Sequence, residues 1–284
     1  MRWNVAARRR WTDRAMTLAC GAAVVLALVP VASLLAYVLS HGIHRLDLAF
    51  FTHLPAPVGE ASGGMANAVV GTLELVAIAC LVGVPVGVLA GTHLAEYGRE
   101  GWFGWTVRFT ADVLSGVPSI VTGIVAYRLV VRPMGHFSAW AGGIALGFMM
   151  IPTVVRTTEE LVKMVPGAVR ESALALGVPE WRTVLRVVLA TARTGIATGI
   201  LLAVARIAGE TAPLLFTSFN NQFWPTGPGQ PTASLTVQVF TYAISPFQDW
   251  HDQAWTGALV LLSIALAIGL AARLLVRRTA GARH

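Results

Sequence analysis

The hydrophobic positions of this chain fall into six long runs that polar segments separate. The runs cover residues 16–40, 67–94, 110–130, 137–156, 193–217 and 255–276. Each run approaches or exceeds the roughly 20 apolar residues that a helix needs to cross the hydrocarbon core of a bilayer. The pattern therefore predicts an all-α polytopic membrane protein with six transmembrane helices between residues 16 and 276. A basic segment, 1–15, precedes them and a basic tail, 277–284, follows.

The composition of the chain agrees with this pattern. Only 12% of the 284 residues are charged, 55% are hydrophobic, and the mean hydropathy is +0.66. Since soluble domains carry about 25% charged residues, these values exclude a disordered chain and disfavour a soluble one. The formal net charge of +7 does not indicate a nucleic-acid partner, because the basic residues lie between apolar runs instead of on one soluble face. We expect a lipid bilayer and no nucleic acid.

The basic residues also indicate an orientation. Bases favour the cytoplasmic side of a membrane. If the N-terminus is cytoplasmic, the outer loops hold only Arg45 and Arg132, and the outer loop 218–254 holds no base. The inner segments then hold Arg2, Arg8, Arg9, Arg10, Arg14, Arg99, Arg108, Arg156, Lys163, Arg170, Arg182, Arg186, Arg193, Arg273, Arg277, Arg278 and Arg283. Both termini and the 157–192 loop are therefore predicted to be cytoplasmic.

The inner loop 157–192 has the pattern of two short helices joined by a turn. Pro166 and Pro179 suit the first turns of helices, and Gly177 suits the left-handed position that ends one. The first of these helices carries an apolar stripe that includes Ala173, and it is too short to span a membrane. Such an amphipathic helix lies either on lipid headgroups or against a soluble partner, and the pattern alone leaves both open.

Two charged residues, Arg206 and Glu210, lie near the middle of the fifth run. They are one helical turn apart and about 15 Å from the expected inner edge. A charge at this depth costs about 2.5–3.5 kcal/mol unless it faces protein or water, so the charged face is predicted to point into the protein. Two roles fit the pair. It forms a packing ion pair, or Arg206 attracts an oxyanion in transit and Glu210 holds Arg206 between passages.

Three hydroxyl residues, Ser115, Ser119 and Thr122, are predicted to share one face of the third span. The sequence at 116–118, Gly-Val-Pro, lies beside them and would loosen the backbone so that N–H groups become available. These hydroxyls either contribute to an anion pathway or bond carbonyls of their own helix. Glu74, in the second run, has no partner recognisable from the sequence.

The chain lacks the residue sets of intramembrane enzymes and of common cofactor sites. Its single lysine, Lys163, follows no glycine-rich turn, which excludes a Walker A phosphate loop. No histidine lies in the middle of a run, and no Gly-x-Ser-x-Gly or His-Glu-x-x-His motif is present. Cys20 and Cys80 are not in the paired spacing of a metal or redox site. We expect no catalytic site, metal or cofactor in this chain.

Several motifs resemble one family of transport permeases. The segment 170–183, with Glu171-Ser172-Ala173 and Gly177, is similar to the EAA loop of ATP-binding-cassette (ABC) import permeases. Ser172 departs from the usual second Ala, and Ala190 stands where many such loops end in Pro. The segments 114–124, 151–160, 205–217 and 233–240 extend the resemblance from about Gly71 to the C-terminus. Together they are similar to PstA-type permeases of the phosphate-specific transport system.

This resemblance implies a type I ABC importer permease fold and ATP-driven transport of inorganic phosphate. The implied partners are a PstC-type permease, two copies of a PstB-type ATPase and a phosphate-binding protein. ATP and Mg would be used by the partner ATPase, and none would be bound by this chain. Arg170, Glu171, Ala173 and Gly177 would couple the chain to that ATPase. The implied location is the cytoplasmic (inner) membrane of a bacterium or archaeon.

Two other functions remain as alternatives. A permease for another oxyanion, such as sulfate or molybdate, would share the charged pair, although the resemblance at residues 209–213 argues for phosphate. A passive membrane scaffold for a kinase-type sensor would explain the 157–192 loop but not two charges at mid-membrane.

Overall fold

The computed structural model describes residues 3–60, 63–98 and 101–281, and every regular element in these ranges is helical. Of the basic residues above, Arg2, Arg99 and Arg283 lie outside the described residues, as do the first two residues of the 1–15 segment and the last three of the 277–284 tail. The elements are α1 (Trp3–Gly42), η1 (Ile43–Arg45), α2 (Leu48–Thr52), α3 (Ala66–Glu96), α4 (Trp102–Gly116), α5 (Ser119–Ala126), η2 (Tyr127–Val131), α6 (Arg132–Met134), α7 (Ala139–Lys163), α8 (Gly167–Ala175), α9 (Glu180–Thr183), η3 (Val184–Val188), α10 (Leu189–Ile207), α11 (Ala212–Leu215), α12 (Leu235–Ala243) and α13 (Gln248–Gly281).

Five helical stretches in the described residues are long and apolar enough to cross a membrane. They are Arg8–Arg45, Ala66–Glu96, Ala139–Lys163, Glu180–Ile207 and Gln248–Leu275. The remaining predicted span, 110–130, is a broken pair in which Trp102–Gly116 and Ser119–Met134 are bent by 107°. With this pair counted as one span, the structure has the six that the hydrophobic pattern predicts.

The bend in the third span is located by Pro118. A proline disfavours helical geometry at the preceding residue, and Val117 accordingly has φ −71° and ψ 128°, an extended conformation. Proline also has no N–H to continue a helical ladder. The helix therefore stops at Gly116 and restarts at Ser119, with Pro118 as the N-cap of α5.

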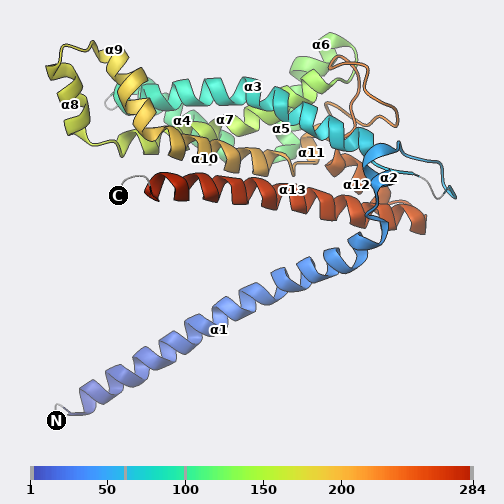
Figure 1. The fold of residues 1–284 in the computed structure, drawn as a ribbon, viewed down its shortest axis with the longest axis horizontal. Coiled ribbons are helices and arrows are strands. Elements are labelled where there is room, and N and C mark those ends of the chain that lie inside the picture. The colour runs from blue at the N-terminus through green and yellow to red at the C-terminus, as the bar shows by residue number, and fades with distance from the viewer. Residues whose placement is uncertain (1–2, 61–62, 99–100, 282–284) are drawn as a thin grey trace.

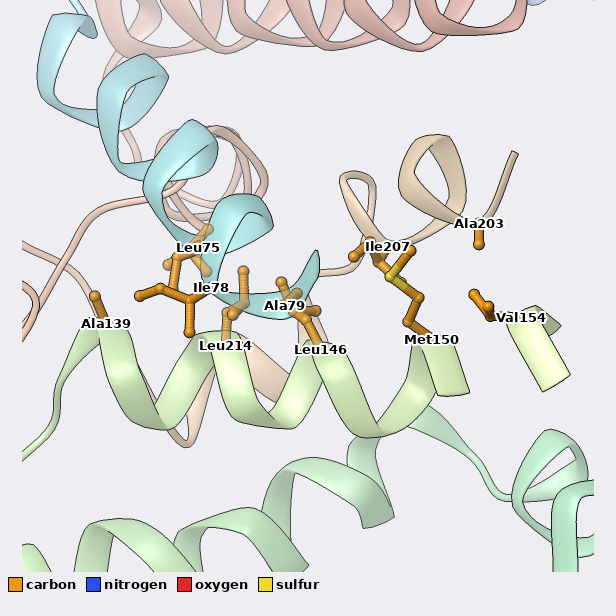
Figure 2. Packing of buried hydrophobic residues seen from close by; sticks show 11 residues of the cluster. Leu75, Ile78, Ala79, Ala139, Leu146, Met150, Val154, Ala203, Ile207 and Leu214 are labelled. Atoms are coloured by element: carbon orange, nitrogen blue, oxygen red, sulfur yellow. The ribbon is translucent and has the colours of Figure 1, made fainter. Parts of the chain in front are cut away.

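The centre of the molecule is formed by α3 and α7, which pack along their length. Figure 2 shows Leu75, Ile78 and Ala79 of α3 over α7, with Ala79 nearest Leu146 and Ile207 of α10 near Met150. Small residues allow this approach: a Cβ added at Gly87 would lie 2.6 Å from Cβ of Val154. Gly83, Gly87 and Gly91 of α3 are all buried, and such small residues let two backbones approach closely where lipid supplies no hydrophobic drive.

The first helix, α1, lies apart from the other spans over most of its length (Figure 1). It meets α13 only near its C-terminal end, where the ring of Tyr37 contacts the ring of Trp255 and Thr256 donates a hydrogen bond to the Gly42 carbonyl at 2.9 Å. The start of α1, the end of α13 and the α8–α9 loop all lie at one end of the long axis (Figure 1). This agrees with the prediction that both termini lie on the same side of the membrane as the 157–192 loop. That this side is cytoplasmic stays a prediction.

Candidate functional site

A break in the fifth span places Arg206 and Glu210 differently from the sequence prediction. The predicted continuous helix over 193–217 is wrong: α10 ends at Ile207, and a separate turn, α11, begins at Ala212. Pro213 explains the break, because a helical proline there would lose a hydrogen bond and clash with the carbonyl of Gly209, four residues earlier. The last turn of α10 therefore opens into irregular backbone inside the predicted span.

Arg206 lies in the last turn of α10 and is exposed, whereas Ala203 and Ile207 beside it are buried. Glu210 lies beyond the helix and is half-buried. Within the described residues, the side chain of Arg206 makes no hydrogen bond or ion pair, so the i, i+4 ion pair with Glu210 is absent. Arg206 does not face the chain's own core, because the core side of α10 is occupied by Ala203 and Ile207; that it faces other protein or water stays a prediction.

A hydroxyl of α12 bonds the break, and a hydroxyl of α3 bonds the start of α12. Thr236 of α12 donates a hydrogen bond of 2.9 Å to the Glu210 carbonyl. Thr72 of α3 accepts one of 2.9 Å from the Leu235 N–H. These hydroxyls and Ser234 border a small cavity of about 10 Å³, close to the space that one water molecule occupies. The Glu210 carbonyl at the break is thus satisfied inside the protein.

The second broken span meets this one. A Cβ added at Gly123 of α5 would lie 2.7 Å from Cα of Pro213, so α5 and α11 are in close contact. Ser119 and Thr122 of α5 are half-buried and make no side-chain hydrogen bond among the described residues. Ser115 lies across the 107° bend and donates to the Ala111 carbonyl of its own helix at 2.9 Å. The predicted common face therefore keeps Ser119 and Thr122 and loses Ser115.

The loop at 157–192 has the predicted form of two helices joined at Gly177. Gly177 has φ +78°, a left-handed conformation that favours glycine, and the Val178 N–H donates to the Ala173 carbonyl at 3.1 Å. Pro166 and Pro179 are the N-caps of α8 and α9. The second helix runs through η3 into α10 without a break, and Ala190 lies within α10 where many such loops have a proline.

Two of the four predicted coupling residues face the chain itself. Ala173 is buried, whereas Glu171 and Gly177 are exposed. Arg170 is turned inward and forms an ion pair with Glu96 at the end of α3, at 2.6 Å. The exposed surface of this loop is apolar instead: Leu176 is 84% exposed and Trp181 56%. The sequence predicted the position of the loop correctly, but not which of its side chains face outward.

A charged network that no sequence pattern indicated joins α4 to the C-terminal end of α7. The carboxylate of Glu159 is only 2% exposed and accepts bonds from Nε of Arg108 at 2.7 Å and Nζ of Lys163 at 2.6 Å. Arg156 lies 3.8 Å from its second oxygen and also pairs with Asp112 of α4. Arg108 is 51 residues from Glu159 along the chain, so no local pattern predicts the contact.

Tyr97, directly after α3, lies where the 157–192 loop comes close to the C-terminal end of α3. Partial burial, together with the neighbouring carboxylates of Glu180 and Glu96, raises the pKa of the Tyr97 phenol above its ordinary value. The start of α9 therefore lies near the end of α3.

Comparisons with known proteins fit this architecture. Residues 83–281 match the family described as "Binding-protein-dependent transport system inner membrane component". The chain belongs to this family. It is thus a multi-pass inner-membrane permease component of an ABC transporter, as the sequence motifs indicated.

Among its relatives, the phosphate transport system permease protein PstA of Yersinia pestis is 48% identical over 82% of this chain and 79% of its own length. The protein of the same name in Xylella fastidiosa is 47% identical over 84% of each chain. The probable phosphate transport system permease protein PstA of Methanocaldococcus jannaschii is 34% identical over 90% of each.

Solved structures share the fold at low sequence identity. A chain of the inward-facing MetNI methionine ABC transporter has a TM-score of 0.59 at 18% identity and covers 75% of this chain and 92% of its own. A chain of a bacterial ABC transporter that imports the acidic polysaccharide alginate has a TM-score of 0.65 at 14% identity, covering 98% and 99%. The fold is that of type I ABC importer permeases.

Proposed function

We propose that this chain is the PstA-type permease subunit of an ATP-driven importer of inorganic phosphate. Its relatives with 43–48% identity are phosphate transport permeases. The observation in the structure that carries the proposal is Arg206, a cation exposed at a helix break within a span. Since a charged side chain inside a membrane faces protein or water and not lipid, the surface around Arg206 belongs to an enclosed interface or pathway.

Phosphate needs several donors once it leaves water, and the two broken spans bring candidates together. Arg206 supplies a planar guanidinium that bonds two oxygens at once. Ser119 and Thr122 lie on α5, which packs against α11 just beyond the break that follows Arg206. Glu210, half-buried in the break, would hold Arg206 when no anion is present. In this reading the pathway runs between this chain and a PstC-type permease.

The cytoplasmic end provides a surface for the ATPase. The α8–α9 turn exposes Leu174, Leu176 and Trp181, and Arg182 lies over the Trp181 ring at 5.0 Å. Exposed apolar groups with a basic residue suit the groove of a soluble protein better than open water. We infer that two PstB-type ATPases engage the permease pair here and use ATP and Mg themselves, while a phosphate-binding protein delivers substrate at the opposite end.

The experiment is phosphate uptake by the reconstituted complex. In the double variant Arg206→Gln with Glu210→Gln, no unpaired charge remains, so assembly should persist. Uptake should fall about ten- to a hundredfold, because a charge-assisted bond worth about 1.5–3 kcal/mol is lost. Arg206→Lys should be intermediate, since its charge persists without the planar fork. The matched control is Arg128→Gln, which removes an exposed cation of η2.

Three outcomes would contradict the proposal. Near-normal uptake by an assembled double variant would show that Arg206 does not serve the anion. An equal loss in the Arg128→Gln control would show that the effect is not specific to Arg206. Competition by sulfate or molybdate as strong as by unlabelled phosphate would favour the other oxyanions.

A further inference from the structure

The ion pair between Arg170 and Glu96 joins two elements that are far apart in sequence. Arg170 belongs to α8, in the cytoplasmic loop, and Glu96 is the last residue of α3. Nη2 of Arg170 lies 2.6 Å from Oε1 of Glu96, and its Nε lies 3.1 and 3.2 Å from Oε1 and Oε2. The side chains are 16% and 10% exposed. The contact is bidentate and charge-assisted, which is the strongest kind of hydrogen bonding that Arg makes with a carboxylate.

The same guanidinium also holds the end of α7. Nη2 donates to the Val162 carbonyl at 2.9 Å, and Nη1 donates to the Val165 carbonyl at 2.5 Å. Val162 lies in the last turn of α7, and Val165 follows that helix. Arg170 therefore fixes α8 to both helices of the central pair. Because its donors are directed at its own chain, Arg170 is poorly placed to bind an ATPase.

An apolar cluster lies beside the ion pair and limits its exposure to water. Ala95, Val162, Val165 and Val188 are buried in this cluster, and Val169 of α8 packs against it. Exclusion of water strengthens the electrostatic attraction between the two side chains. The pair and the cluster together attach α8 to α3 and α7 at one place.

We propose that Arg170 and Glu96 are positioning residues that transmit displacement of α8 to α3 and α7. This inference rests on the proposed function, since it takes the ATPase to move the α8–α9 turn. The exposed apolar residues of the turn bind the ATPase, and the buried ion pair carries the movement inward. Loss of the pair would leave the ATPase bound and hydrolysing while its movement reaches the pathway poorly.

The test uses the full complex, with retained ATPase and phosphate transported per ATP hydrolysed as separate readouts. Glu96→Gln and Arg170→Gln should retain the ATPase but lower transport per ATP about tenfold, within the range of coupling between sites in proteins. The charge exchange, Glu96→Arg with Arg170→Glu, should recover a large part of the loss. Arg193→Gln, which removes an exposed cation at the inner part of α10, is the matched control and should behave as the parent.

The results that would overturn the inference are distinct from those that would overturn the function. Loss of the ATPase from an otherwise folded Arg170→Gln permease would show that Arg170 is a docking contact. Unchanged transport per ATP in both single variants would show that the pair transmits nothing. Should the neutral variants fold poorly, the charge exchange provides the test: a folded exchange variant that recovers none of the transport per ATP would also reject the pair as the link. Failure of the parent complex to transport phosphate would contradict only the proposed function. The role of the ion pair would still be testable, because amide hydrogen exchange over residues 167–175 measures whether Glu96→Gln loosens α8.

Discussion

Neutralising Glu159 should destabilise the chain more than any other single carboxylate change near the C-terminal end of α7. In Glu159→Gln the side chain keeps its shape but loses the charge that Arg108 and Lys163 bond at 2.7 and 2.6 Å. Three basic side chains, including Arg156 at 3.8 Å, then surround a neutral amide. The amide oxygen can still accept from Arg108 and Lys163, but the NH2 group that replaces Oε2 is directed at Arg156, and the attraction of the negative charge is lost.

The magnitude follows from how the charges are buried. Removing one partner of a buried ion pair costs about 3–5 kcal/mol. Glu159 is 2% exposed, but its partners are 23–44% exposed and can turn partly to water. We therefore expect a loss of about 3 kcal/mol, near the lower end of that range, or roughly a hundredfold in the unfolding equilibrium. Arg108 should keep its bonds to the carbonyls of Leu94 and Gly98.

The assay is denaturant unfolding of the purified chain in detergent, followed by tryptophan fluorescence. Trp102 and Trp105 on α4 lie on the helix that Arg108 ties to α7, so their signal should change early. The control is Glu160→Gln, whose side chain is exposed on the same helix and should change stability by no more than about 0.5 kcal/mol. If Glu159→Gln unfolds at the same denaturant concentration as Glu160→Gln, the network does not stabilise the fold.

Two further predictions concern the loop and the topology. Gly177→Val places a β-branched residue at φ +78° and should lower phosphate uptake while the chain still inserts. Gly177→Asn should lower uptake less, because Asn tolerates this conformation. Equal uptake by both variants and the parent would contradict a role for the turn. The topology can be tested by cysteine labelling in a background where Cys20 and Cys80 are replaced. Phe223→Cys, at a position that is 72% exposed, should react with an impermeant thiol reagent added outside intact cells, and Ala168→Cys should not. The reverse labelling would show that the predicted topology is inverted.

The long spans and their packing could be predicted because both depend on local composition and spacing. Apolar runs whose helical length reaches the thickness of the bilayer core predict spans wherever they occur, and glycines four residues apart predict close helix contact. The left-handed turn at Gly177 was also predictable, since few other residues adopt φ near +78°. These features require no knowledge of what lies across the fold.

The contacts of single charged residues could not be predicted in this way. Arg170 borders an amphipathic stripe, which suggests a side chain that faces a partner, yet its carboxylate lies 74 residues earlier. The prolines at 118 and 213 were visible in the sequence, but a proline bends some helices and ends others. Whether Arg206 and Glu210 share a helix depends on which of these occurs at Pro213.

The contrast between Arg206 and the other cations supports the pathway assignment. Arg108, Lys163 and Arg170 each bond a buried carboxylate of the chain itself. Arg206, alone among these four, makes no such bond within the residues that the structure describes. An unpaired cation near the middle of a bilayer costs about 2.5–3.5 kcal/mol unless water or protein surrounds it. The cations that stabilise this fold are therefore paired with carboxylates of the same chain. On the proposed function, a second permease encloses the surface around Arg206, with water or a passing anion in contact with the guanidinium.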